Sequence, residues 1–435
     1  MVSELKEKGF KNKEIEEIPD DWEVKKLGDL FSDMKTGSTP SRSVSQYYTG
    51  TIPWITSGEL KYKVIYDTKE KITEQAVKDT NLRAYPKGTF FIAITGLEAE
   101  GTRGSCAITG VEATTNQSCL AFEPIEGFSN LYLYYWYRLH GDYIAKRYAQ
   151  GTKQQSLNHK IVKEIEILVP PIEEQEKISA ILSSVDEVIE KTEFIIEKTE
   201  KVKQGLMQQV FTKGIGHKEF KETEIGKIPC EWRLVRVSDL TLEHKQGYYT
   251  KDTYVEDGVY LIRITDLKNP KVDFSIMPKL DMDESIYEQF KVEKGDFLFA
   301  RSGASIGRYG IVMEEDPKAV FASYLIRFKF NNEYVNNRYF GYFYESNACW
   351  KQIKSIIQGS SNPNINANNI KNLKIALPSL SEQKQIVDII CSVDEKIRIN
   401  TLILQDLQTL KKGLMQSLLT GKVRVKVDED EVTQV

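Results

Sequence analysis

The feature that most constrains this chain is an internal duplication. KQGLMQQVFT occupies residues 203–212, and KKGLMQSLLT occupies residues 411–420. Further matches lie upstream in the same order: SSVDEVIE and CSVDEKIR, VPPIEEQEKI and LPSLSEQKQI, KGTFFIAITG and KGDFLFARSG, and IPDDWEVKKLGDL and IPCEWRLVRVSDL. Chance similarity does not keep one order over a whole chain, so the sequence is one unit of about 210 residues written twice.

The composition is that of a globular protein without a membrane span. Of the 435 residues, 40% are hydrophobic and 28% are charged, which is ordinary for a globular protein. No run of about 18 consecutive apolar residues occurs. The N-terminal stretch MVSELKEKGFKNKEIEE is charged and lacks the apolar core of a signal sequence. We therefore expect a cytoplasmic protein.

Cysteine and histidine usage predicts neither a disulfide framework nor a metal centre. The 5 cysteines are scattered, and no C-x-x-C occurs. The 4 histidines have no close histidine or cysteine neighbour at ligand spacing. The net charge of −4 argues mildly against a nucleic-acid partner, because phosphate neutralisation dominates non-specific affinity. A basic face can nevertheless coexist with acidic helices.

Each copy consists of a globular part and a helical part. The globular part contains short β-branched and aromatic runs that predict strands, such as TFFIAIT, SCLAFEP, VYLIRI, DFLFA and YLIRFKF. Helical patterns lie between them at residues 131–148 and 339–356. The helical part begins after Pro171 and Pro378 and continues for about 40 residues without proline. The globular parts are therefore expected to be mixed α/β domains.

In the helical parts, mostly apolar residues recur in two heptad rows, which is the pattern of a coiled coil. Lys203, Lys411 and Asn400 also stand in these rows, and buried polar residues of this kind fix register. About 40 residues at 1.5 Å each make a helix about 60 Å long. We expect the helices to pair antiparallel, with an internal pseudo-twofold repeat; the alternative is that each helix packs on its own domain. The predicted seam residues are Ile178, Leu182, Val185, Ile189, Ile196, Leu206, Ile386, Ile390, Val393, Ile397, Asn400, Leu404, Leu407 and Leu414.

Three motifs accompany this layout: an I-P-x-x-W entry at residues 18–22 and 228–232, a P-x-x-E-Q helix start at 171–175, and a K-x-G-L-M-Q helix end. Together, the layout and the motifs resemble the specificity subunits of type I restriction–modification systems. In the second copy the helix start, 378–383, is one residue longer. The resemblance covers residues 10–424, and the combination is specific although no single motif is.

The resemblance implies an α/β (α+β) fold in which two mixed α/β target recognition domains alternate with two long helices that form an antiparallel coiled coil. Each domain would read one half of a bipartite, asymmetric DNA site, while the coiled coil sets the spacing. The expected boundaries are 1–17 for a lead-in, 18–170 and 228–378 for the target recognition domains, 171–212 and 379–421 for the spacer helices, 213–227 for a linker and 422–435 for a tail.

The resemblance also implies a recognition subunit that is not an enzyme and that binds no cofactor or metal itself. Its partners would be double-stranded DNA, two methyltransferase (modification) subunits and restriction/translocase subunits, with no membrane. S-adenosylmethionine would belong to the methyltransferase subunits, and ATP and Mg2+ to the restriction subunit.

The residues agree with a non-catalytic role. The chain has no N/D-P-P-Y/F tetrad and no G-x-x-x-x-G-K-[ST] phosphate loop. Two alternatives stay open: a stand-alone DNA-acting enzyme with an unrecognised nuclease site, and a coiled-coil scaffold that does not bind DNA.

Four stretches in each copy carry residue types that contact DNA. KTGSTPSRS and its counterpart KQGYYTKD suit a flexible loop at a phosphate backbone, or a solvated turn. WITSGELK and LIRITDLK end in polar residues that can reach bases. AITGLEAEGTRGS and ARSGASIGRYG each end in a glycine-flanked arginine, suited to guanine or phosphate, or to a structural salt bridge. QGTKQQSLNHK and QGSSNPNINANN are amide-rich and suit adenine edges, or turns.

The side chains expected to contact DNA come from these stretches. They are Lys35, Thr36, Ser38, Arg42, Thr56, Ser57, Lys61, Thr95, Arg103, Thr152, Lys153 and Gln154 in the first copy, and Lys245, Gln246, Tyr248, Lys251, Arg263, Thr265, Arg301, Ser302, Arg308, Ser360, Asn362 and Asn364 in the second.

Overall fold

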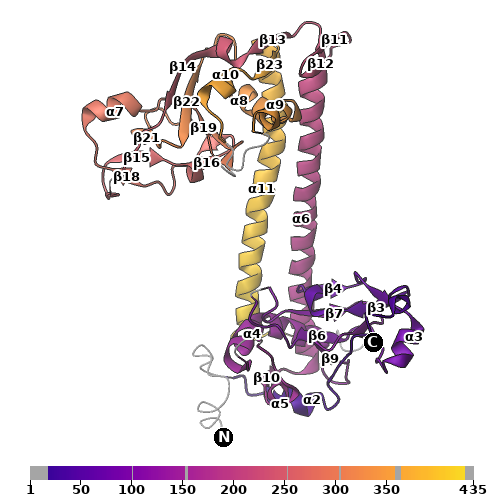
Figure 1. Ribbon diagram of the computed structural model, residues 1–435. Helices are drawn as coiled ribbons and strands as arrows, with labels where there is room; N and C mark the ends of the chain where they lie inside the picture. Colours follow the sequence, from indigo (N-terminus) through magenta and orange to yellow (C-terminus); the bar gives the residue numbers. More distant parts are fainter. Residues whose placement is uncertain are drawn as a thin grey trace. The chain divides into compact units, whose positions relative to one another are not determined.

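A computed structural model describes residues 18–99, 101–151, 155–251, 253–302, 305–357 and 364–426. The chain divides into two compact units. Unit 1 contains residues 1–193 and 403–435, and unit 2 contains residues 194–402. The two long helices, α6 (Ile172–Lys213) and α11 (Leu380–Leu418), therefore each contribute one half to each unit. Figure 1 shows both helices and the mixed domain in each unit.

Unit 1 is built around a five-stranded sheet of order β2-β9-β6-β7-β4. Only the β4–β7 pair of this sheet is parallel. A three-stranded sheet, β5-β3-β8, and the antiparallel pair β1-β10 complete the strands. The strands are β1 Glu23–Lys26, β2 Lys35–Thr36, β3 Ile52–Ile55, β4 Val64–Ile65, β5 Lys71–Ile72, β6 Phe90–Ala93, β7 Cys106–Thr109, β8 Thr114–Thr115, β9 Cys119–Phe122 and β10 Glu166–Val169. Besides the long helices, the α-helices of unit 1 are α2 Leu27–Leu30, α3 Glu74–Asp79, α4 Asn130–Tyr148 and α5 His159–Lys163.

Unit 2 repeats this strand order and adds one strand, β16, at the edge of its larger sheet. Its larger sheet runs β14-β22-β19-β20-β17-β16, its smaller sheet runs β18-β15-β21, and β13 pairs with β23. The strands are β11 Phe220–Thr223, β12 Gly226–Pro229, β13 Arg233–Arg236, β14 Thr241–Gln246, β15 Val259–Ile262, β16 Leu267–Lys268, β17 Lys271–Val272, β18 Lys279–Leu280, β19 Phe297–Ala300, β20 Tyr309–Ile311, β21 Ala319–Phe321, β22 Leu325–Phe330 and β23 Lys374–Leu377. The short helices are α7 Glu284–Phe290, α8 Asn337–Glu345, α9 Asn347–Ile357 and α10 Ala367–Lys371.

The duplication in the sequence is thus a duplication of topology. The runs TFFIAIT and DFLFA form the central strands β6 and β19, as predicted. The predicted helix at 339–356 differs, because it is two helices, α8 and α9. They separate at Ser346, whose extended backbone ends α8 and whose hydroxyl accepts the Cys349 amide of α9 at 3.3 Å.

Aromatic side chains fill the core of each unit. In unit 1, residues 132–137 of α4 are all buried. Tyr132, Tyr134 and Tyr137 share one hydrophobic cluster with Phe90 and with Leu418 from the end of α11. In unit 2, Phe297, Phe299 and Phe340 form the equivalent cluster. The run YLYYWY, residues 132–137, is therefore part of the core.

Within unit 1 the long helices run antiparallel. Asp186 of α6 forms an ion pair with Lys411 of α11. Ile178, nearer the start of α6, shares a hydrophobic cluster with Leu418, nearer the end of α11. In both units, every residue of the two heptad rows is buried or half-buried. These rows therefore form the inner face of the helices.

The motif at each helix start is structural. In unit 1, Trp22 donates its Nε1–H to Glu174 at 2.9 Å, and Arg424 donates to the same carboxylate at 2.8 Å. In unit 2, Trp232 donates to Glu382 at 3.0 Å, and the Ile215 amide donates to it at 2.9 Å. The segment following one long helix thus docks on the glutamate near the start of the other, which is buried in unit 1 and half-buried in unit 2. Part of the predicted linker, 213–227, is ordered in this way and in the β11–β12 hairpin.

Candidate nucleic-acid interface

In unit 1, polar segments meet where three strands of the larger sheet begin or end. Thr36 ends β2, Ala93 ends β6, and Cys119 begins β9. Backbone bonds join the flanking segments, because the Gly37 amide donates to Asn116 at 3.2 Å and the Ile94 amide donates to Ser118 at 2.9 Å. We call this surface edge 1. It consists of Thr36, Ser38, Thr39, Thr95, Gln117, Ser118 and Ser156, the last joined to Thr95 by an isolated bridge.

Unit 2 has the same arrangement at the matching strand ends. The Gly247 amide donates to Leu325 at 3.1 Å, and the Arg301 amide donates to Tyr324 at 3.1 Å. Gln246 also donates its side-chain amide to Ser323 at 3.3 Å. We call this surface edge 2. It consists of Gln246, Tyr248, Arg301, Ser302, Ser323, Tyr324 and Asn364, the last joined to Ser302 by an isolated bridge.

A glycine packs tightly at each edge. A Cβ atom on Gly37 would lie 1.7 Å from the Thr115 carbonyl oxygen, and one on Gly247 would lie 2.2 Å from the Ala322 carbonyl oxygen. No side chain fits at either distance without a backbone shift. The glycines of KTGSTPSRS and KQGYYTKD therefore serve close packing between strands, and not the flexible loop that the sequence analysis expected.

Both edges contain residues that the sequence analysis missed. Gln117 and Tyr324 are exposed and lie in the turns that lead into β9 and β22, with Ser118 between Gln117 and its strand. Both residues lie at the edge of an apolar run, SCLAFEP or YLIRFKF, and such a run predicts a buried strand rather than a binding surface. The available signal was the duplication itself, because both residues lie in the same turn of the two copies, Gln117 one position before the counterpart of Tyr324.

Three predicted arginine contacts are used within the protein. Arg42 pairs with Glu70 through two bonds, one of 2.8 Å, and lies 4.3 Å from the Tyr48 ring centre. The Arg42 guanidinium holds the pKa of Glu70 below its usual value. Arg103 donates to the carbonyls of residues 97 and 98 at 3.1 and 3.0 Å. Arg263 pairs with Asp266, with contacts of 3.0 and 3.1 Å.

Other predicted contacts lie outside the edges. Thr56 caps a short 3-10 helix through Glu59, next to the half-buried Ser57. Lys61 and Lys245 donate to backbone carbonyls at 3.4 and 2.7 Å. The side chains of four further candidates are exposed: Lys35, Lys251, Thr265 and Arg308. Five candidates lie outside the described residues: Thr152, Lys153, Gln154, Ser360 and Asn362.

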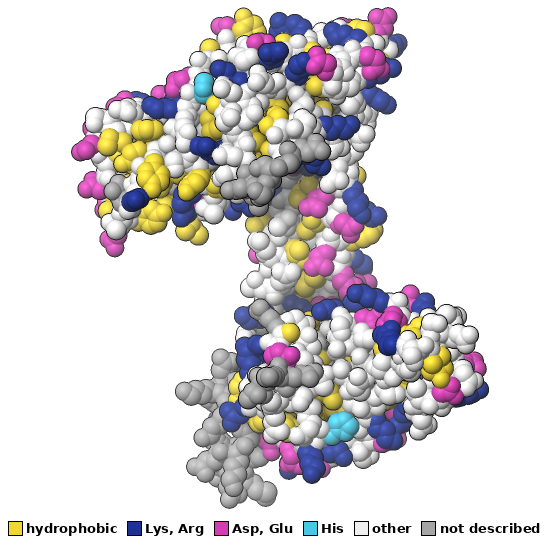
Figure 2. All heavy atoms as spheres, viewed as in Figure 1, with side chains coloured by type: hydrophobic (Ala, Val, Ile, Leu, Met, Phe, Trp, Pro, Cys, Tyr) yellow, Lys and Arg dark blue, Asp and Glu magenta, His cyan; other side chains and the backbone are white. Residues whose placement is uncertain are grey.

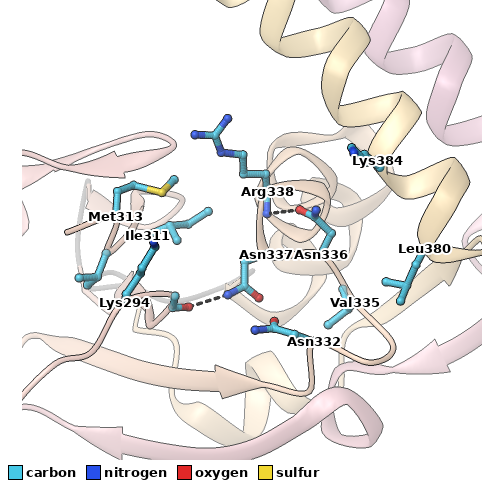
Figure 3. A pocket seen from close by; sticks show the side chains of 12 residues that line it. Lys294, Ile311, Met313, Asn332, Val335, Asn336, Asn337, Arg338, Leu380 and Lys384 are labelled. Atoms are coloured by element: carbon cyan, nitrogen blue, oxygen red, sulfur yellow. Dashed lines mark hydrogen bonds between the residues drawn. The ribbon is translucent and has the colours of Figure 1, made fainter. Parts of the chain in front are cut away.

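A separate cleft of about 410 Å³ lies in unit 2, between the turn before β19, the start of α8 and the start of α11. Figure 3 shows three cationic side chains around it, Lys294, Arg338 and Lys384. The Asn337 side chain donates to Gly295 across this cleft at 2.6 Å. No residue of edge 2 lines the cleft, so the two features are distinct.

Each unit places one lysine of the helix seam in a polar cluster. In unit 1, Lys411 lies by Asp186, which also accepts from Arg138 at 3.0 Å. Burial, and then Arg138, lower the pKa of Lys411. In unit 2, Lys203 lies 2.7 Å from Asp394 and 3.6 Å from Glu345. Burial opposes the charge of Lys203, but Glu345 and Asp394 outweigh it and raise its pKa. Polar residues thus stand inside both halves of the seam.

The outer faces of the long helices carry exposed apolar residues at equivalent places. On α6, within unit 2, Phe194, Ile195 and Val202 are exposed. On α11, within unit 1, Ile403 and Leu410 are exposed. Figure 2 shows hydrophobic side chains on the helix surface among acidic and basic ones. Apolar residues that recur on an outer face are typical of a surface that binds another protein.

The described part of the chain has neither a metal-ligand cluster nor a membrane-spanning helix. Its histidine, cysteine, aspartate and glutamate side chains form no group of three or more that could hold a metal ion. Among its helices, none combines the length and the apolar content needed to cross a membrane.

Comparison with known proteins places these features in a family. The family model of the type I restriction modification DNA specificity domain matches residues 19–201 and 229–409, once in each copy. The type I restriction enzyme MjaVIII specificity subunit of Methanocaldococcus jannaschii is 29% identical over 427 residues, which is 97% of this chain and 97% of that protein. The MjaIX specificity subunit of the same organism is 28% identical, over 98% of this chain and 99% of that protein.

Solved structures show the same fold. The S subunit of a type I restriction–modification system from M. genitalium superposes with a TM-score of 0.59 at 16% identity, covering 95% of this chain and 98% of that one. A chain from a structure described for complex assembly and conformational transition of the type I R-M system gives 0.55 at 14% identity, covering 94% and 100%. At these identities the likeness concerns the fold alone.

The specificity-domain model, matched once in each copy, defines a class of proteins that recognise DNA sequences. The chain belongs to the type I restriction modification DNA specificity family. The predicted resemblance, fold class and sequence-specificity role are confirmed. Neither alternative, the stand-alone nuclease or the scaffold without a DNA role, finds support in these comparisons.

Proposed function

We propose that each unit reads one half of a split, asymmetric DNA sequence through its edge. The observation that carries this proposal is the repetition of one edge geometry with different side chains. Edge 1 presents hydroxyls and an amide, whereas edge 2 presents Gln246, Arg301 and Tyr324. Hydroxyl, amide and guanidinium groups read base edges in the major groove. Two unlike sets on one scaffold fit two unlike half-sites.

The long helices would set the distance between the half-sites. Buried polar groups specify register, because a shifted register leaves them unpaired. Lys411 and Lys203 meet this condition, since each is bound to an aspartate of the other helix. The length of the spacer would therefore follow from the helices, and the bases on either side of it from the edges.

The partners in this proposal are double-stranded DNA, two methyltransferase (modification) subunits and restriction/translocase subunits in the cytoplasm. Ile195 with Val202, and Ile403 with Leu410, form two equivalent apolar patches on the long helices. Two equivalent patches fit two copies of one modification subunit. S-adenosylmethionine would be used by those subunits, and ATP with Mg2+ by the restriction subunit.

The test is methylome sequencing of the host with this gene intact and with it deleted. The proposal expects one bipartite, asymmetric methylated motif to disappear upon deletion. Restoring the gene on a plasmid should restore the same motif. An unchanged set of motifs, with the partner methyltransferase expressed and active, would contradict the proposal.

A further inference from the structure

The turn that precedes β9 or β22 is held rigidly in each unit. In unit 1, the Asn116 amide donates to Ile55 at 3.0 Å, and the Asn116 side chain accepts the Ser118 amide at 3.0 Å. In unit 2, the Ala322 amide donates to Ile262 at 2.9 Å and its carbonyl accepts the Leu325 amide at 2.8 Å. Each turn is therefore tied both to the smaller sheet and to its own strand.

One exposed side chain projects from the middle of each turn. In unit 1 it is Gln117, and in unit 2 it is Tyr324, which is 59% exposed. The neighbours of Tyr324 in the chain are tied by backbone bonds, and its own carbonyl accepts the Arg301 amide. A side chain on a fixed backbone loses little further freedom when it binds, which favours specific contact.

Two of the arginines that the sequence predicted as base readers already have partners within the protein. The guanidinium groups of Arg103 and Arg263 donate to acceptors in their own units. The turn residues keep polar groups available at the surface. The Thr39 hydroxyl donates to Gln117 Oε1 at 2.6 Å. The Nε2 group of Gln117 therefore directs its hydrogens away from Thr39. Within the described residues, that amide has no protein acceptor.

We infer that Gln117 and Tyr324, at neighbouring positions of equivalent turns, are the specificity-determining residues of the two units. Gln117 donates through Nε2 to an acceptor in the major groove, such as guanine O6 or N7 or thymine O4. Tyr324 presents an apolar ring and a hydroxyl, which suits a thymine methyl group and a neighbouring polar edge. This inference rests on the proposed function and names the side chain that carries it in each unit.

The experiment replaces each residue in the full chain, co-expressed with its partner subunits, and sequences the methylome. Gln117→Ala should relax one base position in one half of the motif, with about a tenfold loss of preference there, and leave the other half intact. Tyr324→Ala should do the same in the opposite half. Glu126→Gln and Glu333→Gln are matched controls, because both are exposed and follow β9 and β22 at the far ends of these strands.

Each outcome decides the inference. An unchanged motif in both variants overturns it, as does equal relaxation of both halves by one variant. If a variant abolishes methylation, the purified assembly is titrated with cognate and scrambled duplexes. Loss confined to the cognate duplex supports base reading, whereas equal loss on both duplexes overturns it. Failure of the proposed function is distinguishable, because deletion of the gene would then remove no motif at all.

Discussion

The Lys203 ammonium lies 2.7 Å from the Asp394 carboxylate and joins α6 to α11 within unit 2. Tyr342 donates to the same carboxylate at 2.6 Å. Replacing the lysine would leave Asp394 and Glu345 together in a half-buried site without their cation. We predict that Lys203→Met lowers the free energy of unfolding by about 2 kcal/mol, measured by denaturant titration. Lys201→Met, which removes a surface pair with Glu197, is the control and should change it by less than about 0.5 kcal/mol. Equal effects from both variants would contradict a role for the seam cluster.

Gly37 tests whether close packing shapes edge 1. Because a Cβ there would lie 1.7 Å from a carbonyl oxygen, Gly37→Ala should destabilise unit 1 by about 1–3 kcal/mol and weaken binding of cognate DNA. Gly58→Ala is the matched control, since its nearest neighbour atom is 3.9 Å away. Thermal unfolding and a DNA titration check both expectations. A Gly37→Ala protein as stable as wild type, with normal binding, would show that the packing is unimportant.

Variants of Arg103 and Arg308 should show different effects, because Arg103 has a structural role and Arg308 is exposed. Arg103→Ala removes donors from two carbonyls and should lower the free energy of unfolding by about 1 kcal/mol. Arg308→Ala should leave stability unchanged. If Arg308 contacts a phosphate, its variant lowers the slope of log affinity against log salt by about 1. An unchanged slope removes Arg308 from the interface.

Asp296 gives unit 2 a defined pH dependence. Burial raises the pKa of this carboxyl to about 6, against the opposing effects of the Glu293 backbone amide and Arg327. The folded state therefore binds the proton more tightly than the unfolded state, and stability falls as pH rises from about 4 to 6. We predict that in Asp296→Asn the free energy of unfolding decreases by about 2 kcal/mol less than in the wild type as the pH rises, measured by denaturant titration across pH 4–7. The sign is decisive: a wild-type protein that gains stability relative to the variant over this range would contradict the assignment.

The two apolar patches on the long helices predict that the protein binds two modification subunits. Val202→Glu should prevent one modification subunit from binding, and Leu410→Glu should prevent the other, so the double variant binds neither. Native mass spectrometry of the co-expressed assembly counts the subunits. Gln204→Glu is the control on α6, because it adds the same charge at an exposed polar position. Full assembly of the double variant would place the docking surface elsewhere.

The sequence predicted the repeating architecture well because duplication and heptad spacing are local records of fold. The seam rows follow from a seven-residue period, and every member is buried or half-buried. The strands followed from apolar runs such as DFLFA. The fold class could therefore be predicted from the sequence alone.

The edges were harder to predict, because they depend on contacts between distant segments. Thr36, Thr95 and Gln117 meet only through strand pairing. The sequence shows an arginine but not its partner, so it could not reveal that Glu70 or Asp266 already binds the arginine it suggested. Trp22 of the entry motif and Glu174 of the helix-start motif likewise lie far apart in the chain, and their hydrogen bond explains why the two motifs occur together.

The division of each long helix between two units has a consequence for synthesis on the ribosome. Unit 2 is one continuous segment, 194–402, so all of its parts have been made before residues 403–419 are translated. Unit 1 precedes it in the chain but includes Met415, Leu418 and Leu419 in its hydrophobic cluster. The core of unit 1 therefore cannot close until these residues have been translated, although its sheet is made before unit 2. The sheet of unit 1 must wait with an open apolar surface while all of unit 2 is synthesised.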